Sequence, residues 1–228
     1  MTASRRPESM IARRRFSLQL AGAASLASLG FAPASALAQA GPVEGKDYLK
    51  LKAPAPVSAP AGKIEVTEFF WYGCPHCYAL EPMLEPWRAK LPGDVHFRLV
   101  PFDFGEALRE LHKRIFCTWE VLGLVEKMHV KTFDRFHRER KPINTEKDML
   151  AFAAESGLDV AKVKDAWNSF GLQVKMRQAT QTCEQYDIHS TPVLAIHGRY
   201  ETEPSMAGSG EKALAVTDWL VNRVRKGG

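Results

Sequence analysis

The sequence predicts an α/β fold in which a strand–helix–strand unit is interrupted by a helical insertion and completed by elements near the C-terminus. A run of β-branched and aromatic residues at 63–71 leads through a turn into a helical segment and then a second strand at 95–100. Residues 106–186 have helical periodicity, and a short hairpin and an amphipathic helix follow them. With 228 residues and 45% hydrophobic side chains, the chain can bury a sizeable core.

Residues 1–40 have the composition of an export signal that is later removed. Five arginines precede a segment without charged side chains, from Phe16 to Val43. The small residues of 34–40 permit cleavage after Ala38 or Ala40, and we favour Ala40. The run Arg13–Phe16 resembles a twin-arginine signal, but the ordinary secretion route also fits. Retention as a membrane anchor is the alternative, which the weak apolar character of the segment disfavours.

The rest of the chain is nearly neutral. Removing residues 1–40 takes away five arginines and one glutamate, so the formal charge falls from +5 to +1. No basic run with interleaved aromatic residues remains, which argues against nucleic-acid binding and favours polypeptides or small molecules as partners.

The elements after the signal can be placed in order. Residues 41–62 are expected to be an N-terminal segment and a Pro/Ala-rich connector, with globular structure beginning at 63. The helix after the first strand contains Pro82 and Pro86, which should kink or interrupt it. Four or five helices are expected between 106 and 186, two of them capped by Thr145 and Asp159. A His197-Gly198 turn closes the hairpin, and residues 211–225 form the last helix.

Cys74 and Cys77 are the clearest candidates for chemistry. Structural disulfides rarely join cysteines three residues apart, so the pair requires a redox or metal-binding explanation. Pro75 fits the first turn of a helix, which places Cys74 at the helix N-terminus, where the dipole and free N–H groups favour a thiolate. The intervening His76 adds a further stabilising group. Cys74 is therefore the predicted nucleophile and Cys77 the resolving thiol.

A single zinc half-site is the other explanation of the pair. A second Cys-x-x-Cys or a spaced pair of histidines is missing from the sequence, so we expect no metal and no organic cofactor.

The run from Phe69 to Tyr78, with the sequence FFWYGCPHCY, resembles the active-site strand and turn of the DsbA family of periplasmic oxidases. The resemblance implies a thioredoxin fold, residues 63–104 and 188–226, interrupted by an inserted all-helical domain at 105–187. It also implies a monomer in the periplasm that donates the Cys74–Cys77 disulfide to reduced, unfolded exported polypeptides. A membrane quinone-linked partner of the DsbB type would then reoxidise it.

The same resemblance assigns three further residues. Thr191-Pro192 matches the family's cis-proline opposite the redox pair, and Glu68 matches its buried acidic residue. The family's partnering lysine has no clear equivalent, and Arg98, His96 or neither could replace it.

Two other activities remain open from the sequence. A reductase or isomerase could use the same site, although a dimeric isomerase needs a longer N-terminal domain. A peptide-binding chaperone could retain a vestigial cysteine pair.

The remaining cysteines, histidines and aromatic residues receive structural interpretations. Cys117 and Cys183 could pair as a structural disulfide if their helices pack together. The large aromatic residues of the helical region are expected in the core, although some of them, with Met83, could line an apolar groove for substrates. No role is assigned to five histidines, which are expected on the surface or at caps: His112, His129, His137, His189 and His197.

Overall fold

The computed structural model describes residues 41–227, all of which belong to one compact unit. The predicted export signal and its cleavage position lie outside the described residues. Because the described residues form one unit, the division into a domain at 63–104 and 188–226 and an inserted domain at 105–187 stays a prediction.

A five-stranded mixed sheet lies at the centre of the fold, with the strand order β1-β5-β4-β2-β3. The interior strand β2 pairs in parallel with the edge strand β3 and antiparallel with β4, and β4 pairs antiparallel with β5, which confirms the predicted strand–helix–strand unit and hairpin. The strands are β1 (Leu49–Lys50), β2 (Ile64–Phe70), β3 (Val95–Pro101), β4 (Val193–Ile196) and β5 (Tyr200–Thr202).

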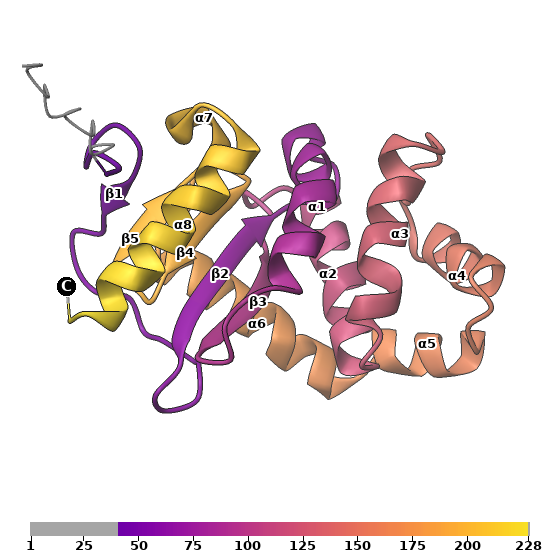
Figure 1. Ribbon diagram of the computed structural model, residues 1–228. Helices are drawn as coiled ribbons and strands as arrows, with labels where there is room; N and C mark the ends of the chain where they lie inside the picture. Colours follow the sequence, from indigo (N-terminus) through magenta and orange to yellow (C-terminus); the bar gives the residue numbers. More distant parts are fainter. Residues whose placement is uncertain (1–40, 228) are drawn as a thin grey trace, which may run out of the picture. The chain divides into compact units, whose positions relative to one another are not determined.

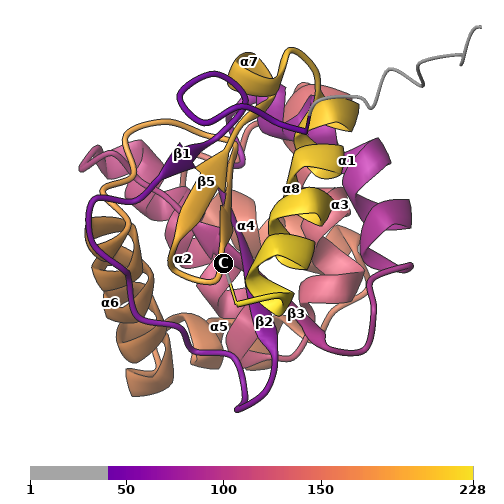
Figure 2. The ribbon, with the colours of Figure 1, turned by 60° about the vertical axis from the view of Figure 1, so that its left-hand side comes forward.

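Helices cover both faces of this sheet (Figures 1 and 2). Helices α1 and α8 pack on the face that contains Val66 and Leu194, and α6 packs on the face that contains Phe69 and Val100. Helices α2 to α5 extend beyond the β3 edge (Figure 1). The helices are α1 (Pro75–Arg88), α2 (Ala107–Val121), α3 (Val125–His137), α4 (Glu146–Glu155), α5 (Val160–Trp167), α6 (Phe170–Gln185), α7 (Pro204–Ala207) and α8 (Gly210–Arg225).

Local sequence signals place several boundaries correctly. The side chains of Thr145 and Asp159 accept hydrogen bonds from the first turns of α4 and α5, as predicted. The β4–β5 turn has φ of 51° at His197 and 64° at Gly198, the positive values that a tight hairpin turn requires. Gly198 is also needed for space, since a Cβ there would lie 2.2 Å from the carbonyl oxygen of Ala55.

The segment 41–62 is part of the folded unit, contrary to the expectation that globular structure begins at 63. Strand β1 pairs with β5 at one edge of the sheet. Beyond it, the amide of Ala55 donates to Gly198 O over 2.9 Å, and the Ser58 hydroxyl donates to Glu65 Oε2 over 2.8 Å. The prolines exclude helix, as predicted, but an extended chain can still satisfy its polar groups against a sheet.

Two helices also differ from the sequence prediction. Of the two effects predicted for Pro82 and Pro86, a kink or an interruption, the interruption is wrong, since helix α1 continues through both, and the kink stays a prediction. The burial of Leu80 and Leu84 against α8 outweighs the missing hydrogen bonds. The short helix α7 was not predicted at all.

Candidate active site

Cys74 is the N-cap of α1, in the extended conformation with φ −81° and ψ 116°. The loop before it is tight: the Cys74 amide donates to the carbonyl oxygen of Trp71 over 2.9 Å. A Cβ on Gly73 would lie 2.3 Å from the indole ring of Trp71, so this position admits only glycine without rearrangement. The backbone of this turn therefore directs the Cys74 sulfur to the N-terminus of the helix.

The two cysteines have opposite acidities. The pKa of Cys74 falls from 9.0 to about 5, chiefly through a hydrogen bond from the Cys77 side chain, against the opposing effect of burial. The backbone amide of Cys77, at 3.5 Å, and that of His76 add to this effect. Burial raises the pKa of Cys77 well above 9.0. The pair is therefore suited to hold a thiolate at Cys74 and a thiol at Cys77.

The other predicted residues of the redox motif lie around these sulfurs. Pro75 occupies the first position of α1, where its missing N–H costs nothing. The His76 side chain is exposed, and it is the backbone amide of His76 that stabilises the Cys74 thiolate. The role predicted for the His76 imidazole stays a prediction.

A segment distant in sequence completes the site. The bond between Thr191 and Pro192 is cis, and the carbonyl oxygen of Thr191 lies 3.4 Å from Cys74 Sγ. The sheet brings the two together, because β4, which follows Pro192, pairs with β2, the strand that leads into the redox loop.

Glu68 is fully buried in β2, and neither carboxylate oxygen has a hydrogen-bond partner. Its pKa is raised well above its ordinary value, first by burial and then by the negative charge of Glu81. Arg88, on α1, is the cation that opposes this rise. Glu81 lies one helical turn beyond Cys77, a spacing from which it could have been found in the sequence.

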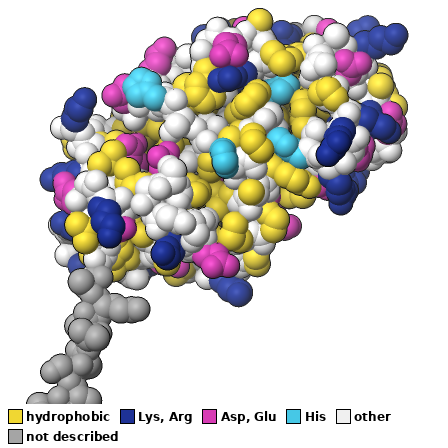
Figure 3. Space-filling model, turned by 90° about the horizontal axis from the view of Figure 1, so that it is seen from above, with side chains coloured by type: hydrophobic (Ala, Val, Ile, Leu, Met, Phe, Trp, Pro, Cys, Tyr) yellow, Lys and Arg dark blue, Asp and Glu magenta, His cyan; other side chains and the backbone are white. Residues whose placement is uncertain are grey.

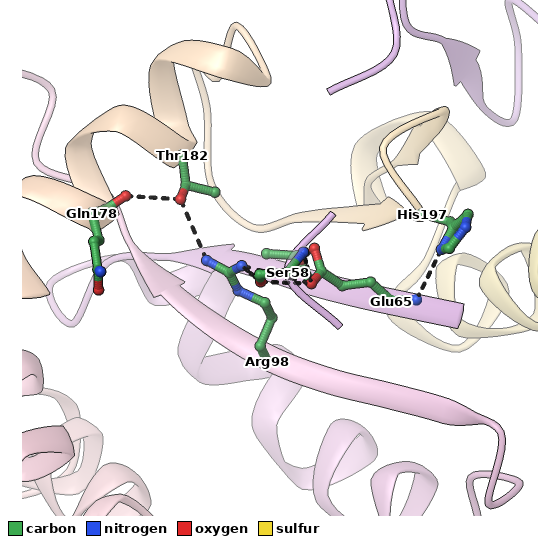
Figure 4. A network of polar contacts seen from close by, with 7 residues as sticks. Ser58, Glu65, Arg98, Gln178, Thr182 and His197 are labelled. Carbon is green, nitrogen blue, oxygen red and sulfur yellow. Dashed lines mark hydrogen bonds and ion pairs between the residues drawn. The ribbon is translucent and has the colours of Figure 1, made fainter. Parts of the chain in front are cut away.

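Arg98 does not replace the missing lysine beside Glu68. Glu68 lies opposite Leu99 in the β2–β3 register, so Arg98 points to the other face of the sheet. There Arg98 lies 3.6 Å from Glu65 Oε2, and it also contacts Ser58 and Thr182 (Figure 4). His96 is two residues from Arg98 in the strand and lies on the same face of the sheet. Neither residue therefore reaches the face that contains Glu68.

Cys117 and Cys183 are both buried free thiols. Cys117 belongs to the core cluster around Trp119, and Cys183 to a different cluster around Tyr186, where it lies 3.8 Å from Pro101 O. Helices α2 and α6 do pack together, but the structure places no bond between the two sulfurs. Burial raises the pKa of each thiol to about 12, which makes both unreactive.

Two histidines expected on the surface are buried. His112 stacks on Trp71, and burial lowers its pKa to about 4. His129 lies between Tyr72 and Glu81 and hydrogen-bonds to both. The sequence does not show this, because the partners lie in the redox loop and in α1, far along the chain from both histidines.

The end of the molecule at which β2 leads into α1 has an apolar surface. Figure 3 shows hydrophobic side chains gathered in the middle of this face, with histidines among them. On one side of the redox loop, the Arg109 guanidinium lies between the rings of Trp71 and Phe104, 4.5 and 4.2 Å from their centroids. Leu108 beside it is 46% exposed.

The described residues contain no helix long and apolar enough to cross a membrane. Over the same range, no three His, Cys, Asp or Glu side chains cluster as they would around a metal ion. The dithiol chemistry described above needs neither feature.

A mixed sheet of this order, with a Cys-x-x-Cys pair at the start of its first long helix and a cis-proline beside it, defines a thioredoxin-fold thiol:disulfide oxidoreductase. Comparisons with known proteins identify the family. A model of the DSBA-like thioredoxin domain matches residues 108–216. The thiol:disulfide interchange protein DsbA of Pseudomonas aeruginosa is 40% identical over 79% of this chain and 85% of its own length. The Burkholderia cepacia DsbA is 39% identical over 88% and 94%.

A solved structure gives the same result. The crystal structure of Pseudomonas aeruginosa DsbA has a TM-score of 0.76 and 38% identity, covering 80% of this chain and 94% of that one. The chain belongs to the DsbA family and is a protein-disulfide oxidoreductase that donates disulfides. The predicted fold, family and activity are thereby confirmed, and donation is favoured over the reductase, isomerase and chaperone alternatives.

Proposed function

We propose that Cys74 is the atom exchanged with substrates and that Cys77 is the resolving thiol. A substrate thiolate attacks Cys74 Sγ of the oxidised enzyme, the Cys74–Cys77 bond breaks, and Cys77 leaves with the electron pair and takes up a proton. A second substrate thiolate then attacks the substrate sulfur of the mixed disulfide, and Cys74 leaves as a thiolate. The substrate loses two electrons and the enzyme gains them.

The observation that carries this proposal is the opposite acidity of the two sulfurs. A thiol whose pKa lies near 5 is a good leaving group at neutral pH, whereas a buried thiol of high pKa holds its proton. A stable Cys74 thiolate favours the reduced enzyme, and this makes the disulfide oxidising.

We propose that Glu68 supplies the proton that Cys77 takes up. Glu68 is buried without a hydrogen-bond partner, and its raised pKa favours the protonated carboxyl. Pro75 and His76 shape the helix start, and Thr191 and Pro192 form the opposite wall of the site, where an extended substrate would lie.

We propose the periplasm as the location and reduced, unfolded exported polypeptides as the substrates. The arginine-rich signal composition of residues 1–40 supports export. The apolar face around the redox pair (Figure 3) suits unfolded chains. A quinone-linked membrane protein of the DsbB type would reoxidise the monomeric enzyme. N-terminal sequencing of the protein isolated from the periplasm should begin at Gly41, whereas an intact Met1 in a cytoplasmic fraction would contradict export.

The equilibrium of the Cys74–Cys77 pair with reduced and oxidised glutathione tests the proposed chemistry. The type member of the DsbA family has a reduction potential of about −120 mV, against about −270 mV for thioredoxin. We therefore expect the potential of the Cys74–Cys77 pair to lie near the DsbA value, at the oxidising end of this range. Cys74→Ser should abolish disulfide donation. Donation that persists in this variant would refute the assignment of the nucleophile.

A further inference from the structure

His129 is a buried polar side chain close to the redox pair. It lies on α3, is 3% exposed, and uses both ring nitrogens: Nδ1 lies 3.1 Å from the hydroxyl of Tyr72 and Nε2 lies 3.2 Å from Glu81 Oε1. Three phenylalanine rings meet it edge to face, with centroids 4.8 to 5.8 Å away. The ring is therefore held between two polar partners inside an apolar shell. The three rings are Phe70, Phe116 and Phe133.

The partners of His129 allow it to gain or lose one proton without leaving a polar group unsatisfied. Burial keeps the pKa of Tyr72 well above 10.0, so this side chain remains a phenol. A phenol can donate to an unprotonated Nδ1 or accept from a protonated one, and the Thr132 side chain beside it offers a second partner. In both states Nε2–H donates to the Glu81 carboxylate.

Glu68 has no such support. Two carboxylates that share a low-dielectric space are rarely both ionised, because each raises the pKa of the other. Among the charged groups that act on the pKa of Glu68, Glu81 has the largest effect. Of the two carboxylates, only Glu81 has a hydrogen bond to a histidine.

We propose that His129 is a positioning residue for the proton used at the redox pair: its hydrogen bond fixes the position of the Glu81 carboxylate, whose negative charge acts on Glu68, so that Glu68, beside Cys77, holds the proton. The inference rests on the proposed role of Glu68. When Cys77 leaves, the Glu68 carboxyl loses its proton to the departing sulfur. The His129 ring holds the Glu81 carboxylate in place through this step, until solvent returns the proton to Glu68.

The other groups that act on this cluster come from two helices, α1 and α2. Helix α1 contributes Cys74, Cys77 and Arg88, of which Arg88 favours the ionised form of Glu68. Helix α2 contributes Cys117, whose effect falls on Tyr72. Because these groups interact, the pH dependence of exchange reports apparent pKa values of the whole cluster and not the pKa of one residue.

His112 provides a matched control. It is also 3% exposed, and it also lies against aromatic rings, those of Trp71 and Phe136. Burial and the charge of Arg109 lower its pKa to about 4, and none of the charge effects on it comes from a carboxylate.

The test compares the full chain with His129→Gln and His112→Gln. The rate at which glutathione reduces the oxidised enzyme is measured against pH, at constant concentration of the glutathione thiolate. Loss of the hydrogen bond from the ring to Glu81 should move the apparent pKa of this profile upward by about one to three units in His129→Gln. The His112→Gln profile should superimpose on that of the unmodified protein.

A His129→Gln profile that superimposes on the unmodified one, with exchange intact, would overturn the inference and leave the roles of the cysteines standing. Absence of exchange in the unmodified protein would instead refute the proposed function. If His129→Gln fails to fold, nitrogen NMR of labelled histidine in the unmodified protein decides the matter. The His129 titration should differ between the oxidised and reduced states and that of His112 should not, and identical His129 titrations would refute the proposal.

Discussion

The acidity of Cys74 should appear as a pH-dependent stability of the reduced protein. The thiol pKa is 9.0 in the unfolded chain and about 5 in the fold, so between these values the unfolded state binds more protons. Stability then rises with pH by about 1.4 kcal/mol per unit. The contribution is complete above pH 9 and is lost as pH falls through 5.

From pH 5 to pH 8 the full effect would be about 4 kcal/mol, and solvent screening at the mouth of the site reduces it to about 2 kcal/mol. The assay is denaturant unfolding of the reduced protein and of reduced Cys74→Ser at several pH values. Subtracting one curve from the other removes the contribution of all other groups. The difference should grow with pH, and thiolate absorbance should titrate near pH 5.

A difference that stays constant from pH 5 to 8, together with a thiolate that titrates near pH 9, would refute the reasoning. The hydrogen bonds at the helix N-terminus would then not stabilise the charged sulfur.

Three further substitutions test individual contacts. Cys77→Ala removes the main hydrogen bond to Cys74 and should raise its pKa by about one unit or more in an absorbance titration. Glu68→Leu removes a buried carboxyl without a partner and should raise the unfolding free energy by about 1–3 kcal/mol at neutral pH. Because folding raises the pKa of Glu68, this gain should shrink as pH falls toward the ordinary carboxyl range; a pH-independent gain would contradict it. Arg98→Ala leaves the Glu65 carboxylate buried and should cost about 2–3 kcal/mol in denaturant unfolding, less than for a fully buried pair because Arg98 is 24% exposed. The Cys74 titration should not change in this variant, and a shift there would mean that Arg98 acts on the redox side after all.

The structure differs from the sequence prediction mainly where side chains from separate elements meet. The burial of His129 could not be foreseen, since its partners lie 57 and 48 residues away in the chain. The side of the sheet on which Arg98 lies depends on the β2–β3 register, which the sequence of β3 alone does not reveal. The connector was misjudged for a related reason: composition excludes helix at Pro54 and Pro56, but it carries no information about which strand the segment contacts.

The sequence by itself determined the local chemistry: a strand, a turn, and a helix that begins at Cys74. These features depend on backbone sterics, capping and helix dipoles, which act over a few residues. The capped helices α4 and α5 and the β4–β5 turn follow from rules of the same range.

Only the tertiary structure decided how the site is completed. It brought the Thr191 carbonyl within 3.4 Å of the Cys74 sulfur and enclosed Glu68 beside Glu81. Such contacts depend on strand order, register and helix packing, because burial and the proximity of charges are properties of the assembled fold.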